Sequence, residues 1–306
     1  LIDLKNPPTL PPQTQLLSSQ TTHLQPFPPF SFTTAQTQQQ IQQECIHYNE
    51  RSSALYFREY FDVKSVDEMM REDWVLSVSN ILRNVSMISR NAKAMNECVD
   101  LFKTSADIIQ HGSISKLVRQ NLVDMFLNLS LSLSEDEQSI EILLQAAMNL
   151  LDPKSVHVHR RWQAESAQLI ANLSASFQQN NDASERAIIS KLDAILPLLV
   201  DLMHSANEPQ VEAALHAVCN ISAFENESVR RKLARAVSLI PRLIAMLGIG
   251  VKSVRAALTL LNLAEIPANR FILLQYEQTF IYYAFCENPA SEIIARVLKE
   301  LVLDLD

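Results

Sequence analysis

Glycine is the residue type that this chain most clearly lacks. Only three occur in 306 residues, whereas average usage of about 7% would give roughly twenty. Tight β-hairpin turns need residues with positive φ, which glycine supplies most readily. Glycine-rich phosphate-binding loops are missing too, since neither GxGxxG nor a P-loop motif occurs. The scarcity excludes hairpin-rich β folds, favours an all-α fold and argues against nucleotide cofactors.

Paired cysteines and long apolar runs are also missing. The four cysteines lie 53, 121 and 67 residues apart, a spacing that indicates free thiols rather than a disulfide framework. Free thiols are typical of cytosolic or nuclear proteins. No uninterrupted apolar stretch approaches the ~20 residues that span a bilayer, so no membrane partner is expected. The chain does not begin with Met, and we expect it to be a fragment of a longer protein.

Positive charge is in deficit. The formal net charge is −8, whereas a duplex-binding surface needs several Lys or Arg to neutralise phosphates. Direct sequence-specific binding of nucleic acid is therefore not expected. The densest basic run contains Arg230, Arg231, Lys232 and Arg235. It indicates a solvated helix face, with a local acidic partner, either a protein or a nucleosome, as the alternative.

Patterns of catalysis and metal binding do not occur. There is no HExxH and no GxSxG. His157 and His159 form the one tight histidine pair, but residues two apart point to different sides of a helix and make a poor metal pair. Asp136 and its acidic neighbours indicate a helix start, where negative charge favours the helix dipole. We therefore expect no enzyme, no catalytic residue, no cofactor and no metal.

The first 44 residues differ in composition from the rest. Seven of the thirteen prolines and eight glutamines fall within the first 40 residues. Repeated Pro-Pro pairs forbid regular helix, and the composition predicts a disordered Pro/Gln-rich linker over residues 1–44. Residues 26–30, Pro-Phe-Pro-Pro-Phe, could instead dock on the rest of the chain or on a partner. The helical pattern begins afterwards, so residues 45–306 are predicted to form a helical repeat domain.

A short signature recurs through that domain: Asn, an aliphatic residue, then Ser or Ala. The intervals between its occurrences are 44, 44, 48 and 42 residues. A period in this range is typical of armadillo and HEAT repeats, which stack into a right-handed α-solenoid. The chain is predicted to hold about five to six such repeats. The five signature asparagines are Asn84, Asn128, Asn172, Asn220 and Asn262.

Apolar residues three or four apart accompany each signature and predict that it lies on a helix. Other helices are predicted between the signatures, over residues 136–151, 184–204, 228–247 and 268–285, with a capping helix near 291–302. The predicted unit is thus a short helical segment, a turn and a longer signature helix. Pro197 and Pro241 also lie 44 residues apart, and each is expected to open the second helix of its repeat.

Asparagine is a poor helix former, so its recurrence within helices needs a reason. In a structural interpretation, each amide bonds a backbone group in an adjacent turn or repeat, and its loss would cost about 1–3 kcal/mol. In a functional interpretation, the amides form a ladder along a concave groove and pair with the main chain of an extended peptide. The sequence leaves both interpretations open.

The residue four positions before each asparagine shares its helix face. Four of the five are polar, which indicates that this face meets solvent or a partner. None is Trp, the residue typical of this position in armadillo nuclear-import adaptors, so a receptor for basic signals is not expected. The candidate contact residues are Asn80, Asp124, Gln168 and His216, and Leu258 occupies the fifth position.

Two longer strings give the chain a family resemblance. Residues 78–86, Val-Ser-Asn-Ile-Leu-Arg-Asn-Val-Ser, with Asn91 and Met95 after them, resemble the start of the C-terminal armadillo-like domain of the large AT-rich-interaction-domain (Osa-type) subunit of SWI/SNF chromatin remodellers. Residues 255–264, with Asn269-Arg270 and Tyr276-Glu277 beyond them, resemble that domain's last repeat. The similarity extends over about residues 70–300.

The resemblance implies a nuclear, non-catalytic scaffold of a SWI/SNF-type chromatin-remodelling complex. Such a scaffold holds core subunits around the helical region of the ATPase and meets the nucleosome only indirectly. The armadillo subunit of the polybromo-containing remodeller class is an alternative branch. A free-standing peptide-binding adaptor of the signalling or adhesion kind is the alternative function. The 48-residue interval around Asn180 and Asn181 leaves open a binding loop.

Overall fold

A computed structural model of the chain describes residues 66–111, 114–133, 136–152, 160–175 and 182–302. These residues belong to the second of the two units into which the chain divides, 65–306. The predicted boundary at residue 45 and the linker with its Pro-Phe patch lie outside the described residues. So do the His157–His159 pair and the segment around Asn180.

The described residues form α-helices and no strand. The five signatures lie on α2 (Val66–Ser86), α5 (Lys116–Ser130), α7 (Arg160–Ala175), α9 (Glu208–Ser222) and α12 (Gly250–Ala264). Between these signature helices lie α3 (Ser89–Asn96), α4 (Val99–Gln110), α6 (Glu137–Leu151), α8 (Asp182–Met203), α10 (Glu227–Arg235) and α11 (Leu239–Met246), and α12 is followed by α13 (Pro267–Leu274) and α14 (Glu277–Ala284). The last helix is α15 (Ser291–Val302).

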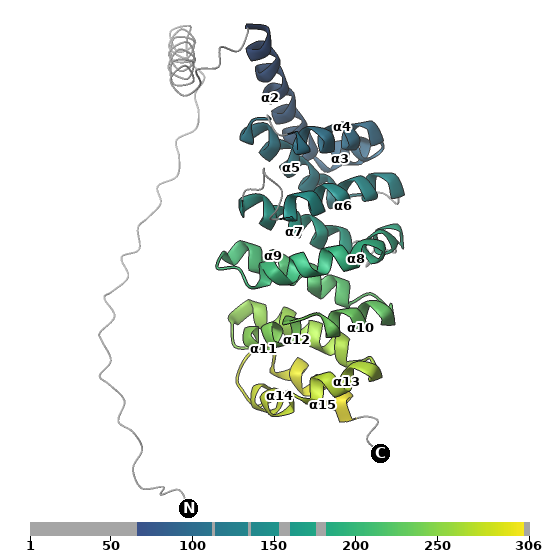
Figure 1. Cartoon of the computed structure of the whole chain (residues 1–306), viewed down its shortest axis with the longest axis vertical. Helices are drawn as coiled ribbons and strands as arrows, with labels where there is room; N and C mark the ends of the chain where they lie inside the picture. The colour runs from purple at the N-terminus through teal and green to yellow at the C-terminus, as the bar shows by residue number, and fades with distance from the viewer. Residues whose placement is uncertain (1–65, 112–113, 134–135, 153–159, 176–181, 303–306) are drawn as a thin grey trace, which may run out of the picture. The chain divides into compact units, whose positions relative to one another are not determined.

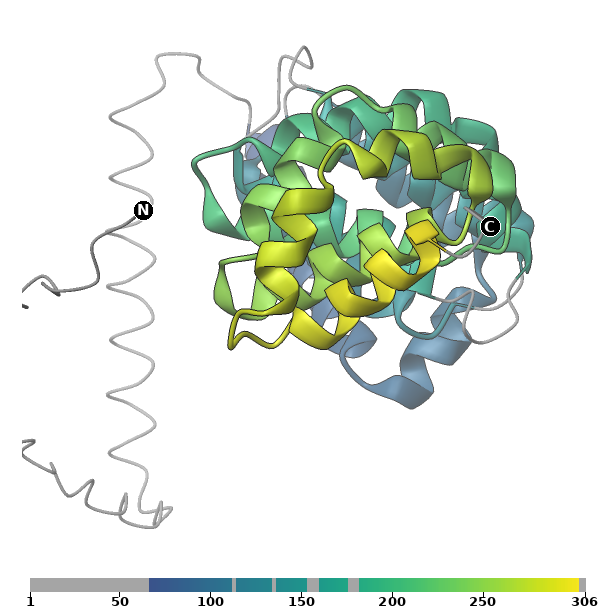
Figure 2. The ribbon, with the colours of Figure 1, turned by 90° about the horizontal axis from the view of Figure 1, so that it is seen from below.

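Within the unit from residue 65 onward, the helices stack in two rows. The signature helices pack on one another in chain order, and α15 continues their row against α12. In the second row α4 packs on α6, α6 on α8, and α8 on α10 (Figure 1). Figure 2 looks along this stack from its α15 end and shows the earlier helices lying behind α13, α14 and α15. Each repeat thus contacts mainly its neighbours, and the predicted all-α solenoid is confirmed.

Helix starts carry the expected caps. Ser115 accepts a hydrogen bond from the backbone N–H of Val118 at 3.2 Å before α5. Asp136 accepts from the backbone N–H of Ser139 at 2.8 Å before α6. These side chains satisfy backbone donors that the first helical turn leaves unpaired. The predicted helix-start role of the acidic run is therefore confirmed at Asp136.

The predicted two-part repeat is only partly right. The segments predicted as single helices over 228–247 and 268–285 each form two short helices, α10 with α11 and α13 with α14. At the α10–α11 junction Ser238 takes positive φ, 65°, and Pro241 lies in the first turn of α11. The prediction for Pro197 was wrong, because α8 runs unbroken through it for 22 residues. Its exposed ring faces solvent, where a helix bends most easily around the missing N–H.

One apolar core runs between the two rows of helices. In its first half, large rings fill the space: Phe102 and Phe126 stack with their centroids 6.0 Å apart. In its second half, the signature helices also bury many small side chains. The buried alanines of α9 and α12 are Ala213, Ala214, Ala217, Ala256, Ala257 and Ala264.

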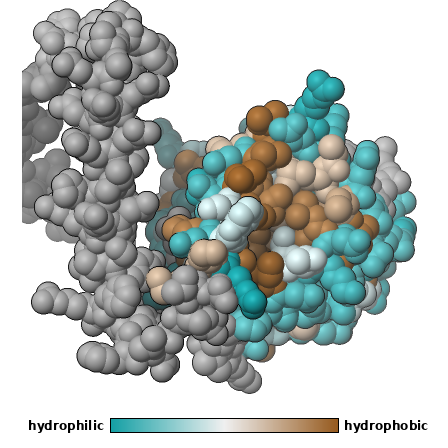
Figure 3. Space-filling view, turned by 90° about the horizontal axis from the view of Figure 1, so that it is seen from above, coloured by the Kyte–Doolittle hydropathy of each residue, from teal (hydrophilic) through white to brown (hydrophobic). Residues whose placement is uncertain are grey.

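The first signature helix leaves its packing face uncovered by described residues. On α2, Trp74 is 72% exposed and Ile81 is 60% exposed. The residues at the same distances before the signature asparagine of α5 are Val118 and Met125, and both are buried. Figure 3 looks onto the α2 end of the stack and shows a band of hydrophobic residues there. This band matches the surface by which the other signature helices stack, and no described residue covers it on α2.

A candidate protein-interaction face

The signature face comprises the five signature asparagines and the residues four positions before them. None of these side chains is buried. Asn80 and Asn84 are exposed, Leu258 is 37% exposed, and Asp124, Asn128, Gln168, Asn172, His216, Asn220 and Asn262 are half-buried. The face is therefore accessible across five stacked helices. Whether a partner binds it remains a prediction.

Three of the asparagines donate to the signature serine of the preceding repeat. Their amide nitrogens lie 3.0 Å (Asn128 to Ser86), 2.9 Å (Asn172 to Ser130) and 2.9 Å (Asn262 to Ser222) from the serine hydroxyl oxygens. The structural interpretation expected a backbone acceptor, whereas the acceptor in these three is a side chain. The signature thus forms a polar connector between repeats. Its Asn donates to the Ser of the preceding repeat, and its Ser accepts from the Asn of the following repeat.

Each of these serines can accept because its own proton is used within its helix. The hydroxyls of Ser86, Ser130 and Ser222 each donate at 2.7 Å to the carbonyl three residues earlier. A hydroxyl bonded in this way keeps its lone pairs for an incoming amide. The fifth signature carries Ala264 in place of Ser, so it offers no side-chain hydroxyl to an amide.

The connection between α7 and α9 departs from this rule. Asn220 donates to the backbone carbonyl of Ala171 at 2.8 Å. Ser174, the signature serine of α7, donates to that same carbonyl at 2.9 Å and to the carbonyl of Ile170 at 2.8 Å. The longest interval in the repeat, 48 residues, falls at this junction. Here the Asn220 amide binds about one turn before the signature serine of α7, and the carbonyl oxygen of Ala171 replaces the serine hydroxyl as acceptor.

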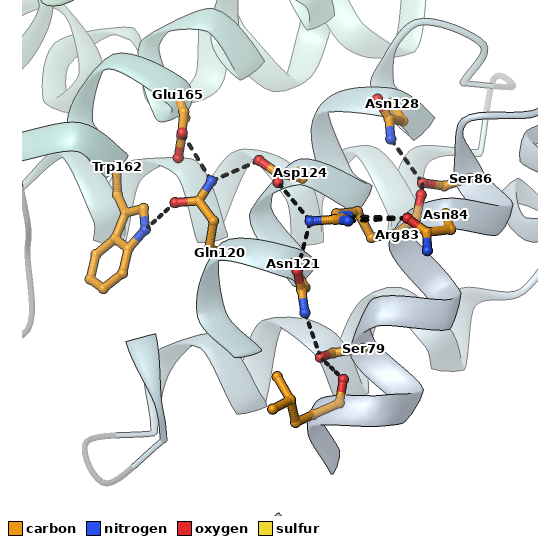
Figure 4. A network of polar contacts seen from close by, with 11 residues as sticks. Ser79, Arg83, Asn84, Ser86, Gln120, Asn121, Asp124, Asn128, Trp162 and Glu165 are labelled. Carbon is orange, nitrogen blue, oxygen red and sulfur yellow. Dashed lines mark hydrogen bonds and ion pairs between the residues drawn. The ribbon is translucent and has the colours of Figure 1, made fainter. Parts of the chain in front are cut away.

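Beside the connectors, a wider polar network joins α2 to α5 (Figure 4). Arg83 donates to Asn121 Oδ1 at 3.1 Å and lies 4.0 Å from Asp124 Oδ2. The buried Asn121 donates in turn to Ser79 Oγ at 3.1 Å. Arg83 also donates to Asn84 Oδ1 at 3.3 Å. Side-chain bonds of this kind fix the relative position of the two helices.

Gln120 extends the network from α5 to α7 (Figure 4). Its amide nitrogen donates to Asp124 at 2.7 Å and to Glu165 at 3.0 Å, and its carbonyl oxygen accepts from Trp162 Nε1 at 3.0 Å. The guanidinium of Arg119 lies 4.9 Å from the centre of the Trp162 ring, which is cation–π distance. The buried Trp162 thus joins two repeats through both its ring and its N–H.

The side chains of His216 on α9 and Arg255 on α12 interact electrostatically. Burial, and then the positive charge of Arg255, lower the pKa of His216 below its usual value. Both side chains are half-buried. The lowered pKa thus reflects the burial of His216 first and the neighbouring charge of Arg255 second.

The basic run on α10 is mostly used within the fold. Arg230 Nη1 pairs with Glu265 at 2.6 Å, and Arg230 Nε donates to carbonyls at the end of α9 at 2.9 and 3.0 Å. Arg231 and Lys232 form ion pairs with acidic residues of their own and a neighbouring helix. Only Arg235 lacks an ion pair among the described residues. These pairs favour the solvated-face interpretation of the run.

Features of an enzyme site are weak in the described part of the chain. It contains no cluster of His, Cys, Asp and Glu suited to a metal ion, and none of its helices is long and apolar enough to cross a membrane. A cavity of about 450 Å³ shares no residue with the signature face, and its Gln163 and Gln210 bond each other at 2.9 Å. Burial raises the pKa of the Cys219 thiol, opposite to the shift of an activated nucleophile.

Two plant proteins, both named armadillo repeat-containing protein LFR, are similar in sequence. The protein of Oryza sativa subsp. japonica is 26% identical over 267 residues, 82% of this chain and 56% of that protein. The protein of Arabidopsis thaliana is 27% identical over 241 residues, 74% of this chain and 50% of its relative. The chain thus spans about half the length of the curated relatives it matches. No protein-family model matches it.

Solved structures of designed armadillo repeat proteins are similar in fold. One has a TM-score of 0.58 at 19% identity and covers 74% of this chain and 92% of the designed chain. Another, in complex with the peptide (KR)4, has a TM-score of 0.58 at 18% identity over 74% and 92% of the two chains. The fold is therefore an armadillo-repeat solenoid, suited to binding proteins and peptides, and no catalytic family is indicated.

Sequence reasoning missed the Gln120–Trp162 connection. Trp162 lies ten residues before its signature asparagine, at the position that Val118 occupies in α5. The apolar character of this position predicts that the ring of Trp162 is buried. The partner of its N–H could not be predicted, because Gln120 lies 42 residues away on another helix.

Proposed function

We propose that the chain is a non-catalytic scaffold of a nuclear SWI/SNF-type ATP-dependent chromatin-remodelling complex, where it holds core subunits and the helical region of the ATPase. The observation that carries the proposal is the signature face, a row of accessible, mostly polar side chains continuous over five stacked helices. A surface of that extent suits an elongated protein partner better than a small substrate.

Two further observations support the scaffold role. The strings that resemble the Osa-type subunit, residues 78–86 and 255–264, lie on the first and last signature helices. The uncovered apolar stripe around Trp74 on α2 is of the kind that subunit interfaces expose when isolated. The net charge of −8 supports nucleosome contact through other subunits rather than direct binding of DNA.

Affinity capture from nuclear extract tests the proposal. The tagged full chain serves as bait, and a designed armadillo repeat protein serves as control because it has the same fold and a different surface. Stoichiometric recovery of remodeller core subunits and the ATPase, measured by mass spectrometry, is the expected result. Recovery of unrelated partners, or of the same proteins on both baits, would contradict the scaffold role. Microscopy of the tagged chain tests the nuclear location.

A free-standing peptide-binding adaptor is the second candidate. It is favoured by the designed relative in fold that was solved with a peptide and by the polar character of the signature face. An adaptor should return a partner from extract through one short extended segment, and a synthetic copy of that segment should compete with the whole partner. A scaffold with several subunit contacts should resist such competition.

A further inference from the structure

The two end helices of the row expose different kinds of side chain. The exposed side chains of α15 include the charged Glu292, Arg296 and Lys299, and a polar exposed surface is what a terminal helix of a solenoid needs in water. The exposed side of α2 is instead largely apolar (Figure 3). Its members three or four residues apart form one side of the helix, which we call the α2 face: Met70, Trp74, Val78, Ile81 and Asn84.

Helix α7 carries a matching face that is covered. Its Trp162 and Asn172 lie ten residues apart, as Trp74 and Asn84 do on α2. Trp162 is 4% exposed, whereas Trp74 is 72% exposed. The helix that packs on this side of α7 is α5. The contact of α5 with α7 therefore shows which chemistry covers a face of this kind.

Three side chains of α5 meet the tryptophan and the asparagine of α7. Gln120 Oε1 accepts from Trp162 Nε1 at 3.0 Å, and the Arg119 guanidinium lies 4.9 Å from the centre of the same ring. Ser130 Oγ accepts from Asn172 Nδ2 at 2.9 Å. Both hydrogen bonds join residues 42 apart in the chain, so the two helices run parallel and in register.

The corresponding donors on α2 are unused within the described part of the chain. Neither Trp74 Nε1 nor Asn84 Nδ2 has a hydrogen-bond acceptor there. Asn84 Oδ1 accepts from Arg83 at 3.2 and 3.3 Å (Figure 4), which leaves the amide nitrogen free to donate elsewhere. A helix that covered the α2 face would therefore gain two hydrogen bonds together with the apolar contact.

We propose that the α2 face is the docking site of an amphipathic helix from a partner protein, which packs parallel to α2 as α5 packs on α7. An acceptor side chain such as Gln or Glu lies at Trp74, and a hydroxyl near Asn84 accepts its amide. These two groups are ten residues apart, as Trp74 and Asn84 are, or about 15 Å along a helix, and apolar side chains between them cover Val78 and Ile81. The inference rests on the proposed function, since it takes the chain as a subunit of a protein assembly.

A partner protein is favoured over a second copy of the chain. Head-to-tail stacking would set the exposed Arg296 and Lys299 of α15 opposite Trp74 and Asn84, where all four groups are hydrogen-bond donors. A two-fold pair would set two α2 faces together. Each face would again offer mainly donors, because the Asn84 oxygen is held by Arg83.

Acrylamide quenching of tryptophan emission in the free full chain is the first test. The chain has two tryptophans, and Trp162 is buried, so the quenchable emission should belong to Trp74 and should disappear in Trp74→Phe. A shielded Trp74 in a monomeric chain would mean that the chain covers the face itself, and would overturn the proposal. So would a dimer, measured by light scattering, that Ile81→Asp converts to a monomer.

A stapled helical peptide with the sequence of α5 is the docking probe, because it carries Gln120, Ser130 and Arg119 at the required spacing. Binding should shield Trp74 from acrylamide and shift its emission to the blue. Asn84→Ala in the full chain should raise the Kd of the peptide about two- to tenfold, and Ile81→Asp should abolish binding. A peptide that leaves the Trp74 emission unchanged would overturn the proposal.

Matched controls separate docking from general effects of substitution. Asn80 is exposed one turn before Asn84 and lies outside the α2 face, so Asn80→Ala should leave the Kd unchanged. The peptide with Ser130→Ala should bind wild type more weakly, yet should bind Asn84→Ala no more weakly than the unmodified peptide does, because the two groups share one bond. Equal losses from Asn80→Ala and Asn84→Ala would contradict the parallel register.

The two proposals fail separately. If capture returns no remodeller subunits while the peptide docks in a manner that depends on Asn84, the scaffold role fails and the docking site stands. If wild type and Ile81→Asp capture the same remodeller subunits and the peptide does not bind, the docking site fails and the scaffold role stands.

Discussion

The two halves of the row of signature helices are joined by different means. In the first half, α2, α5 and α7 are connected by long polar side chains, among them Arg83, Gln120 and Trp162. In the second half, α9 and α12 present buried alanines such as Ala214 and Ala257, and the polar connection is largely the signature bond from Asn262. Long polar side chains therefore hold the first helices in register, whereas in the second half the close packing of small side chains contributes more.

Truncation of a core leucine in each half should have the largest effect. Leu122→Ala in α5 and Leu215→Ala in α9 each remove a buried side chain and should lower the free energy of unfolding by about 2–5 kcal/mol. The loss should be greater at Leu215, because nearby alanines such as Ala214 have no rotamers that could fill the cavity. Chemical denaturation measures both.

Leu258→Ala is the matched control, since Leu258 is 37% exposed on the signature face. It should cost clearly less than either core substitution. A loss at Leu215 no larger than at Leu258 would contradict the picture of a tightly packed second half.

The double variant Asn128→Ala, Asn172→Ala comes next in size. It removes both signature bonds of the first half, and we expect a loss of about 2–4 kcal/mol, because the hydroxyls of two buried serines, Ser86 and Ser130, lose their amide donors. Thermal unfolding and the capture of partner proteins from nuclear extract are measured together. Early melting supports the structural interpretation of the asparagines, and unchanged melting with weaker binding supports the peptide ladder.

Asn84→Ala provides the comparison for that variant. Asn84 is exposed and accepts a bond only from Arg83 of its own helix among the described residues. Its removal should change stability by no more than about 0.5 kcal/mol. A loss as large as that of the double variant would show that helix propensity, and not the connector bond, sets the cost.

Substitution of the signature serine should cost more stability at the junction of α5 with α7 than at the junction of α7 with α9. Ser130→Ala leaves the Asn172 amide without its acceptor at 2.9 Å and should cost about 1–2 kcal/mol. Ser174→Ala removes a hydroxyl that receives no amide, because Asn220 binds Ala171 instead, and should cost less than about 0.5 kcal/mol. Equal losses, measured by denaturant unfolding, would mean that the two junctions are joined alike.

Much of this architecture could be predicted from the sequence, because periodic signals carry it. The recurrence of the signature predicted the stack, and the apolar residues around Leu122 predicted which side of each helix is buried. The acceptor of Asn172 could have been predicted too, since Ser130 belongs to the preceding signature. Both bonding groups, the amide and the hydroxyl, belong to the repeated signature.

The rest depends on contacts between residues that no local pattern connects. The unbroken course of α8 through Pro197 arises where a helix is long enough to tolerate one missing hydrogen bond, whereas Pro241 follows a real break at Ser238. The bond from Asn220 to Ala171 depends on the packing of α7 against α9.

The smallest predicted effect is a pH dependence confined to the second half of the face, since α2, α5 and α7 contain no histidine. Burial and the charge of Arg255 lower the pKa of His216 in the folded chain, below the value of about 6.5 expected when unfolded. The unfolded chain therefore binds the proton first as pH falls. The stability contribution of neutral His216 is present above about pH 6.5 and is lost as pH falls from there through the folded pKa.

His216→Gln should remove this part of the pH dependence, measured as the free energy of unfolding between about pH 7.5 and 5.5, a window on either side of the unfolded pKa. An NMR titration of the His216 ring gives the folded pKa directly. Arg255→Gln should raise that pKa partway, because burial remains after the positive neighbour is removed. If His216 instead titrates at or above its unfolded value, burial and the charge of Arg255 do not set its pKa, and the predicted pH dependence fails.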